Sequence, residues 1–296
     1  MFRRLLENTI MLSIFTNSAA MSSTNSMNRA TGALNVAMER LGTGKRINSA
    51  ADDAAGLQIA TRLQGQTNGM GVAMNNINKA TAMMQTAEGA FDEVNNILFR
   101  MKDLATQAAD DTNNGDDRKS LQGEFTALNA ELNNIMNNTS YGSEQLLLNA
   151  SGTGGYGKLG QDMQFQIGAS SKETLKVNLG TELGAVVTAL TEIADPSAIS
   201  ESAADANEML DKVSTALDTV GGIRSALGAN INRLGHTAAN LANMRDNTQL
   251  NLGAIQDADF AAEASQMSRQ NMLTQSSQAM LKQANQMGSM VLGMLG

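Results

Sequence analysis

One long apolar stripe, from Ile59 to Ala108, limits what this chain can fold into more than any other feature. Its members recur in steps of four and three residues, interrupted only at Gln66. They are Ile59, Leu63, Met70, Ala73, Ile77, Ala80, Met84, Ala87, Phe91, Val94, Leu98, Met101, Ala105 and Ala108. This spacing keeps one face of a helix against a partner over about 50 residues, or roughly 75 Å. Such a helix is longer than a compact domain needs, and its length favours a structural building block over an enzyme.

The composition suits helices packed through small and flexible side chains. The chain has 296 residues, of which 42% are hydrophobic, and this is enough to bury a core. Aromatic residues make up 3% while methionine reaches 20 residues, so the packing rests on Ala, Leu, Ile, Val and Met. A single proline fits long uninterrupted helices. We therefore expect a mainly α fold, a long antiparallel helical rod or coiled-coil bundle.

Charge and residue counts exclude several function classes. The chain has no cysteine and a single histidine, His236, so neither a thiolate nor a histidine-based metal site can be built. The net charge of −8 argues against nucleic acid as a partner, because phosphate binding needs a basic surface. No run of about 18 apolar residues is present, so we expect no membrane insertion. No cofactor is expected.

Four further apolar stripes predict helices. The first ends near Leu41, the second follows the polar stretch 110–117, and the last two occupy the C-terminal third. Their members are Met27, Ala30, Leu34, Ala37 and Leu41; Leu121, Phe125, Leu128, Leu132 and Ile135; Val213, Leu217, Val220, Leu227, Ile231, Leu234, Ala238 and Leu241; and Leu273, Met280, Ala284, Met287, Val291 and Met294. Arg224 interrupts the third of these stripes.

Short polar segments predict how the elements are joined. Ser49 and Asp52 have the spacing of a capping box, in which the Ser49 hydroxyl and the Asp52 carboxylate satisfy each other's free backbone amides. We therefore expect the long helix to start there. The turn at 110–117 predicts an antiparallel neighbour. The alternating segments 163–167 and 175–179 predict a β-hairpin, and we expect residues 180–201 to be only a connection.

Both ends of the chain read as amphipathic helices without a local partner. Such helices pair either with one another or with other copies of the chain, so self-assembly follows. Stripes rich in Ala, Met and Gln bury too little surface to stabilise themselves, and we expect both ends to be disordered in the free monomer.

Four segments resemble bacterial flagellin, in the same order along the chain. They are LGTGKRINSAADDAAGLQIA at 41–60, TAEGAFDEVNNIL at 86–98, MSRQNML at 267–273 and QANQMGSMVLGML at 283–295. The resemblance spans about residues 12–296. Many flagellins carry large outer domains after the hairpin, and this chain has almost no room for them.

The resemblance implies a structural subunit of the flagellar filament with two layers. Residues 11–48 and 256–296 would be the N- and C-terminal inner-tube helices. Residues 49–136, 137–199 and 200–255 would form the N-terminal part, the loop and hairpin region, and the C-terminal helix of the rod. Residues 1–10 would be an extension or a misassigned start. Assembly would use Met27, Leu34, Leu41, Leu273, Met280, Ala284, Met287, Val291 and Leu295.

The same resemblance implies partners and a location. The subunit would leave the cell through the flagellar type III apparatus, with an export chaperone on its C-terminal helix. It would polymerise with itself under the flagellar cap, next to hook-associated proteins, outside the bacterium. Hosts would recognise Arg100, Leu104 and Glu124 through the Toll-like flagellin receptor, and these residues would also make contacts between protofilaments.

Three alternatives stand beside the filament subunit. A hook-filament junction protein shares the helical ends, and a secreted translocator would use them on lipid, although it should be more basic. An enzyme is the least favoured class. Residues 155–160 spell a dinucleotide-binding fingerprint, GYGKLG, but a loop precedes it and a strand follows, which is the wrong context.

Overall fold

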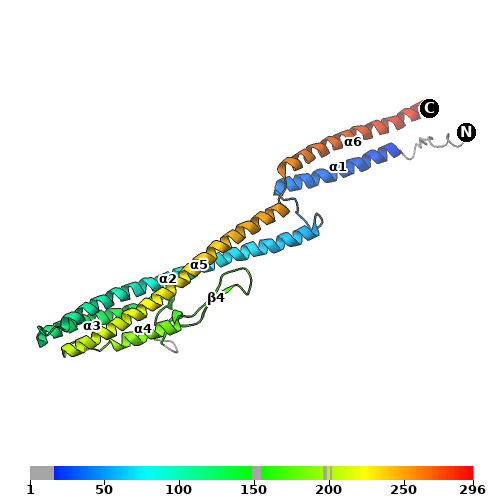
Figure 1. Ribbon diagram of the computed structural model, residues 1–296. Coiled ribbons are helices and arrows are strands. Elements are labelled where there is room, and N and C mark those ends of the chain that lie inside the picture. Colours follow the sequence, from blue (N-terminus) through cyan, green and yellow to red (C-terminus); the bar gives the residue numbers. More distant parts are fainter. Residues whose placement is uncertain (1–16, 149–154, 196–198, 201, 296) are drawn as a thin grey trace. The chain divides into compact units, whose positions relative to one another are not determined.

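The computed structural model describes residues 17–148, 155–195, 199–200 and 202–295, and these are mostly helical (Figure 1). The chain divides into two compact units. The terminal unit contains the described residues up to Gln64 and from Gln249 onward, and the central unit contains Gly65–Thr248. The expected extension at residues 1–10 lies outside the described residues.

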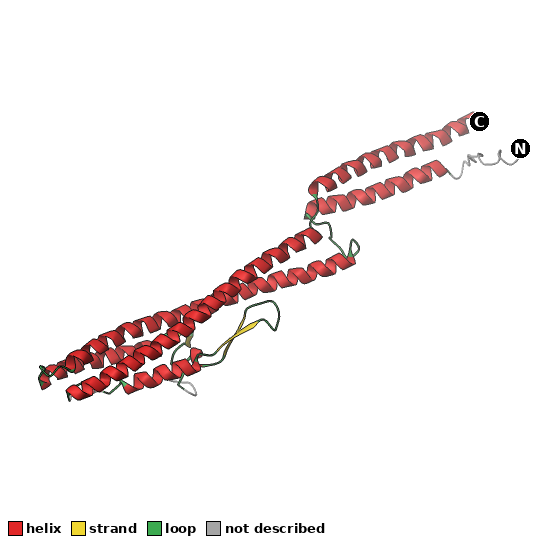
Figure 2. Cartoon of the chain, viewed as in Figure 1, coloured by secondary structure: helices red, strands yellow, loops and turns green. Residues whose placement is uncertain are grey.

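Figure 2 shows how few of the described residues form strands. The helices are α1 (Ser18–Thr43), α2 (Ala54–Ala108), α3 (Gly115–Asn138), α4 (Gly180–Glu192), α5 (Ala203–Gln256) and α6 (Phe260–Leu295). The strands are β1 (Ser140–Tyr141), β2 (Glu144–Gln145), β3 (Met163–Gln166) and β4 (Thr174–Val177), with a short 3-10 turn, η1 (Lys158–Gly160), before β3. The expected mainly α fold with a small β region is confirmed.

The stripe on α2 forms the centre of the core in the central unit. Every member of the stripe from Met70 to Ala108 is buried. One hydrophobic cluster joins these residues to buried residues of α3, α4, α5 and the β3–β4 hairpin. At the other end of the stripe Ile59 is exposed, and Ala60 is buried instead. The 3.5-residue spacing therefore identified the packed face of α2 throughout the central unit.

A tight turn reverses the chain between α2 and α3. Asn114 caps α3 by accepting from the amides of Asp116 and Asp117, and the Asp117 carboxylate accepts from the amide of Asn114. Arg118 of α3 donates through Nε to the carbonyl of Ala108, the last residue of α2, at 3.0 Å. The two helices are therefore antiparallel neighbours, as the polar turn predicted.

The hairpin forms where alternation predicted it. Strands β3 and β4 pair antiparallel, with Met163 opposite Val177 and Phe165 opposite Leu175. Met163, Leu175 and Val177 are buried and join the core of the central unit.

The expectation that residues 180–201 form only a connection is wrong. Residues 180–192 are the helix α4, which buries Leu183, Val186, Ala189 and Leu190 in the same core. These apolar residues follow a helical spacing, so the signal was present in the sequence. The helix is short and follows a Gly-rich region, which hid it.

Arg224 interrupts the apolar stripe of α5 because it pairs with two carboxylates of α2. Its Nη2 atom lies 3.0 Å from Glu88 Oε1 and 2.8 Å from Asp92 Oδ1. Glu88 and Asp92 are one helical turn apart on α2, so one guanidinium contacts both. This charged contact fixes the register of α5 against α2 at a position that apolar packing does not specify.

The start of α2 is a correction to the expected capping box. The helix begins at Ala54, and Asp53 caps it, because the Asp53 carboxylate accepts from the amide of Gly56 at 2.8 Å. Asp52 reaches back to the amide of Ser49, as predicted, but the Ser49 hydroxyl donates to Asp52 at 3.0 Å instead of capping the helix. Ser49 and Asp52 thus close a turn before the helix and do not start it.

Two connections lie side by side in the terminal unit. The amide of Arg46, in the connection between α1 and α2, donates to the carbonyl of Gln256 at 2.7 Å. The amide of Ala258, between α5 and α6, donates to the carbonyl of Gly44 at 3.0 Å. Gly44 has a φ of 72° and ends α1 in the left-handed conformation that glycine adopts without strain. The signature segment 41–60 therefore holds the two connections together.

Candidate assembly surfaces

The stripe of α1 packs against α6 within the terminal unit. The two helices lie side by side along their lengths (Figure 1). Ala30 and Ala37 are buried, and Met27, Leu34 and Leu41 are half-buried. Because α1 presents this face to α6, these three predicted assembly residues are committed to a contact inside the chain.

The face of α6 that packs against α1 and is shielded by it is largely polar. Its shielded positions are Glu263, Gln266, Met267, Gln270, Thr274, Ser277, Leu281 and Ala284, and only Ala284 is fully buried. Two polar contacts join the helices. The Asn17 side chain donates to the carbonyl of Ala284 at 2.9 Å, and Arg40 lies 3.5 Å from Glu263. Such a pair buries little apolar surface, so its packing contributes weakly to stability.

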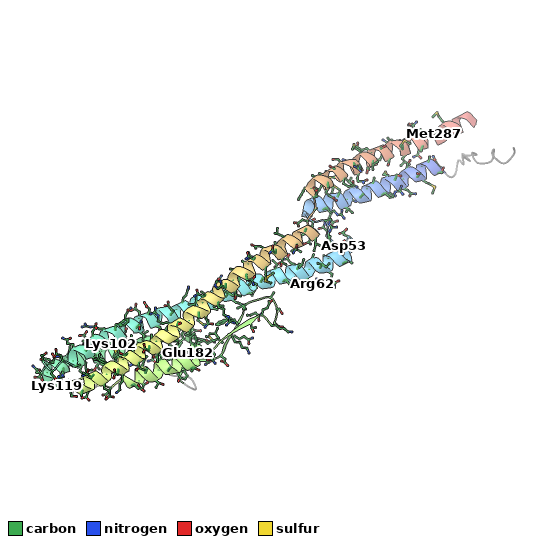
Figure 3. All side chains as sticks on the ribbon, viewed as in Figure 1. Asp53, Arg62, Lys102, Lys119, Glu182 and Met287 are labelled. Carbon is green, nitrogen blue, oxygen red and sulfur yellow. The ribbon has the colours of Figure 1, made fainter. Side chains whose placement is uncertain are left out.

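The apolar residues of α6 that face away from this pair differ from the predicted stripe, and we call them the α6 stripe from here on. They are Met272, Leu273, Met280, Met287 and Met290, which are all exposed, and Met287 is labelled on α6 in Figure 3. Of the predicted assembly residues on this helix, only Ala284 belongs to the shielded face. Val291 and Leu295 lie in α6, but their side chains are outside the described residues. The sequence left open whether the terminal stripes pair with one another or with other copies, and the stripe of α6 remains free in the single chain.

The residues expected to face a receptor separate into an exposed pair and a core residue. Arg100 of α2 and Glu124 of α3 form an exposed ion pair, with Nη2 2.6 Å from Oε1. Leu104 is 1% exposed and packs in the core of the central unit, so its expected place on this surface is wrong. Helical spacing puts it one turn from Arg100, but the core of the central unit covers that side of α2. Phe99, which the sequence did not single out as a contact, is exposed beside Arg100.

The turn that precedes α2 holds an ionised carboxylate. Asp52 accepts from the amides of Ser49, at 2.8 Å, and Asn48, at 3.1 Å, and from the Ser49 hydroxyl. These bonds stabilise the charged form and lower the pKa of Asp52 below its ordinary value of 3.8, the Ser49 amide having the largest effect. The carboxylate thus acts as a structural acceptor.

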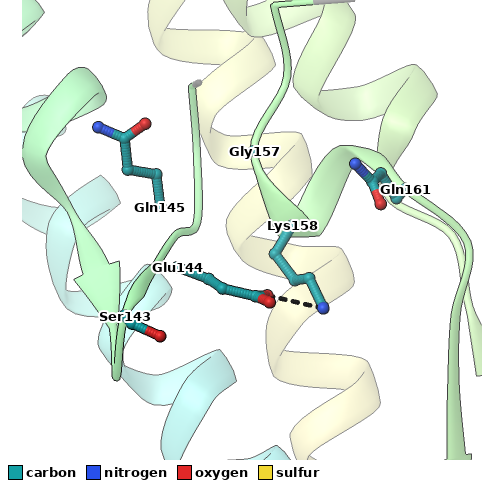
Figure 4. Close-up of a pocket in the computed structure, with 6 residues that line it drawn as sticks. All are labelled: Ser143, Glu144, Gln145, Gly157, Lys158 and Gln161. Atoms are coloured by element: carbon teal, nitrogen blue, oxygen red, sulfur yellow. Dashed lines mark ion pairs between the residues drawn. The ribbon is translucent and has the colours of Figure 1, made fainter. Parts of the chain in front are cut away.

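The polar cavity nearest the fingerprint-like segment offers no chemistry of its own. It has a volume of about 500 Å³ and is lined by Ser143, Glu144, Gln145, Gly157, Lys158 and Gln161 (Figure 4). Glu144 and Lys158 neutralise each other there at 2.6 Å. Gly157, the middle glycine of the GYGKLG segment, is required for packing, because a Cβ atom would come within 2.5 Å of the Leu146 backbone. A turn and β3 follow, as expected, and not the helix that a dinucleotide site needs.

The described residues contain neither a metal-binding cluster nor a membrane-spanning helix. Across residues 17–148, 155–195, 199–200 and 202–295, no group of three or more His, Asp or Glu side chains could hold a metal ion. Of the helices in the described part of the chain, none is long and apolar enough to cross a membrane.

Comparison with known proteins agrees with this architecture. Residues 14–152 match the bacterial flagellin N-terminal helical region, and residues 210–295 match the bacterial flagellin C-terminal helical region. The chain is 32% identical to flagellin A of Vibrio anguillarum, over 96% of this chain and 99% of that protein. It is 39% identical to a flagellin of Halalkalibacterium halodurans, over 88% of this chain and 90% of that one.

A solved structure shares the fold at low identity. It is assigned as a flagellar hook-associated protein of Vibrio parahaemolyticus, and the match has a TM-score of 0.55 and 15% identity over 70% of this chain and all of that one. At this identity the match describes the fold alone.

A bundle of long helices and a terminal helix with an exposed apolar stripe are typical of a structural protein that associates with copies of itself. The family matches are specific, and the chain belongs to the bacterial flagellin family. It is a structural subunit of the flagellar filament. The alignment with the Vibrio anguillarum relative takes 385 positions for a chain of 296 residues, so this is a short form that lacks the variable outer domain.

Proposed function

We propose that the filament is held together through the exposed stripe of α6, and that this stripe orders against neighbouring copies as each subunit is added. The observation that carries the proposal is the division of α6 into two faces. Its shielded face is largely polar, and its outward face carries Met272, Leu273, Met280, Met287 and Met290. Exposed apolar side chains gathered on one side of a helix favour an interaction surface.

Folding of the ends accompanies assembly. Among the described side chains of α1 and α6, the buried ones are Ala30, Ala37 and Ala284, and alanine contributes little burial. Helices that gain so little from each other are marginal in water. Contacts with neighbouring copies then supply the free energy that orders them, offset by the entropy of fixing the chain.

The weak stability of the terminal helices also suits export of the subunit from the cell. Subunits with weakly stable ends pass through the flagellar type III apparatus in an unfolded form and fold under the cap at the growing tip. Before export, a chaperone covers the apolar stripe of α6 and prevents early association. The helices at 11–48 and 256–296 then form the inner tube, and residues 49–255 form the surrounding layer, next to hook-associated proteins at the base. No catalytic step is part of this function.

A pair of substitutions on the exposed stripe tests the assembly surface. Met280→Asp with Met287→Asp places two charges where neighbours would pack, and we expect filaments to be lost or their critical concentration to rise at least about a hundredfold. The matched control is Gln278→Asp, an exposed position of α6 outside the stripe, which should polymerise normally. Electron microscopy and sedimentation after seeding read the result. Normal filaments from the double variant would contradict the proposal, as would normal filaments after deletion of 281–296.

Host recognition belongs to the exposed Arg100–Glu124 pair, with Phe99 beside it. A reporter-cell assay for the Toll-like flagellin receptor compares Arg100→Glu, Glu124→Arg and the double swap. The double swap restores the ion pair but reverses both charges, so a receptor that reads these side chains stays silent. Recovery of signalling in the double swap would show that the pair acts only by joining α2 to α3. Leu104→Ala is unsuitable here, because it would test the core.

A further inference from the structure

Four methionines of α6 are exposed, whereas the buried methionines of the described residues all lie in the central unit. On α6 the exposed fractions are 65% for Met272, 59% for Met280, 50% for Met287 and 64% for Met290. On α1, Met21 and Met38 are exposed as well, and on α5 Met244 is exposed. The buried methionines all belong to the central unit, and they are Met70, Met83, Met84, Met101, Met136, Met163 and Met209.

The four exposed methionines of α6 share one side of the helix. They follow one another at steps of eight, seven and three residues. At 3.6 residues per turn, these steps stay within an arc of about 80°. The shielded row from Glu263 to Ala284 occupies the other side of α6. The thioether sulfurs of the stripe are therefore open to solvent in the single chain, whereas those of the core are closed to it.

Exposed thioethers react with peroxides. The sulfur lone pair attacks one oxygen of hydrogen peroxide, the O–O bond breaks, and the second oxygen leaves as water after a proton transfer. The sulfur loses two electrons, the peroxide gains them, and the product is methionine sulfoxide. The sulfoxide is polar where the thioether was apolar, and methionine sulfoxide reductases reverse the change, with one enzyme for each epimer.

We propose that Met272, Met280, Met287 and Met290 form a reversible oxidation site that controls assembly. Peroxide oxidises this stripe in the unassembled subunit, leaves the core intact and stops polymerisation. In the filament the same side chains are covered and protected. The control of assembly rests on the proposed role of the α6 stripe, whereas the selectivity of oxidation rests on exposure alone and is measured separately.

The first experiment measures selectivity. The full chain, as monomer, is treated with dilute hydrogen peroxide, and sulfoxides are located by peptide mass spectrometry over time. We expect the four methionines of the α6 stripe to oxidise at least about tenfold faster than Met84, Met101 and Met209, because reaction follows exposure. Circular dichroism should show that the thermal unfolding of the central unit is unchanged. Equal oxidation of core and stripe would overturn the proposal.

The second experiment measures assembly. Oxidised monomer is seeded with filament fragments, and we expect its critical concentration to rise at least about tenfold, the factor that loss of one buried methionine side chain gives. Treatment with the two sulfoxide reductases should restore assembly. A variant with leucine at all four positions (Met272→Leu, Met280→Leu, Met287→Leu and Met290→Leu) should polymerise, and it should still assemble after peroxide treatment, although Met21, Met38 and Met244 remain open to oxidation. The matched control, Met84→Leu with Met101→Leu in the core, should remain sensitive.

Failure of this inference is distinct from failure of the assembly proposal. If the untreated chain forms filaments and the oxidised chain assembles equally well, the oxidation site is wrong. If Met280→Asp with Met287→Asp also assembles, the stripe is not the assembly surface. If the leucine variant fails to assemble for its own reasons, the oxidised wild-type chain gives the test. If the sulfoxide reductases restore its assembly, the oxidation site is supported, and if they do not, the proposal is overturned.

Discussion

One buried polar side chain of α3 serves a buried backbone amide. Gln122 of α3 is buried among apolar residues, and its Oε1 accepts from the amide of Ile199 at 2.8 Å. Its Nε2 donates to the Thr126 hydroxyl at 3.2 Å. Ile199 is itself fully buried in the core of the central unit. The glutamine therefore satisfies a backbone donor that water does not reach.

Replacement of Gln122 by methionine keeps the volume and removes the acceptor. We expect Gln122→Met to lower the free energy of unfolding by about 1–3 kcal/mol, because the Ile199 amide stays buried without a partner. Gln107→Ala, at an exposed position of α2, should change it by less than about 0.5 kcal/mol. Urea denaturation followed by circular dichroism measures both. Equal stability of the two variants would show that the amide finds another acceptor.

Asp52 makes the turn before α2 sensitive to acid. Its pKa is lowered in the folded chain, so its contribution to stability is fully present above the ordinary value of 3.8 and is lost as the pH falls through the lowered pKa. We expect the protection factors of the Asn48 and Ser49 amides, measured against the intrinsic exchange rate at each pH, to fall in that acid range. Asp52→Asn should lower these protection factors at neutral pH and remove their fall in acid. A wild-type turn that is equally protected on both sides of this range would contradict the assignment.

At the scale of elements, α4 shows how a short helix contributes to the core. It supplies Leu183 and Val186 at full burial, and its opposite side carries the exposed polar residues Thr181, Thr188 and Glu192. The helix is too short to be stable alone, so packing holds it in place.

Leu183→Ala tests that packing. We expect a loss of about 2–5 kcal/mol in the free energy of unfolding, since the cavity left in a dense core adds to the lost burial. Thr188→Ala, at an exposed position of the same helix, should cost far less. Thermal and urea denaturation give the comparison. A small loss from Leu183→Ala would mean that α4 is loosely attached.

At the scale of the whole molecule, net charge opposes assembly. Each copy carries a formal charge of −8, so neighbouring copies repel one another at low ionic strength. In the assembly that we propose, the α6 stripe overcomes this repulsion during polymerisation.

Salt should therefore promote filament growth. We expect the critical concentration to fall when sodium chloride is raised from low to physiological strength, where the screening length is about 8 Å. Sulfate should have a stronger effect at equal ionic strength, because it also favours apolar burial. Sedimentation of seeded samples gives the values. A critical concentration that rises with salt would indicate that ion pairs between copies dominate the contact.

The sequence by itself determined the elements whose signal is local. The stripe from Met70 to Ala108 and the alternation of β3 and β4 identified the packed faces, because a side chain's face follows from its position in a regular element. The signature segments, which resemble flagellin, also identified the family. Helix ends were less certain, and the start of α2 moved from Ser49 to Ala54 because capping depends on which nearby carboxylate reaches the free amides.

Only the tertiary structure decided which partner covers each face. Periodicity groups residues on one side of a helix, but coverage depends on segments far away in the chain. Leu104 is buried because the core of the central unit covers that side of α2, and the largely polar side of α6 meets α1 while its methionine stripe stays exposed. Burial of α4 likewise depends on a core that four helices and a hairpin build together. These choices are long-range, so no local pattern fixes them.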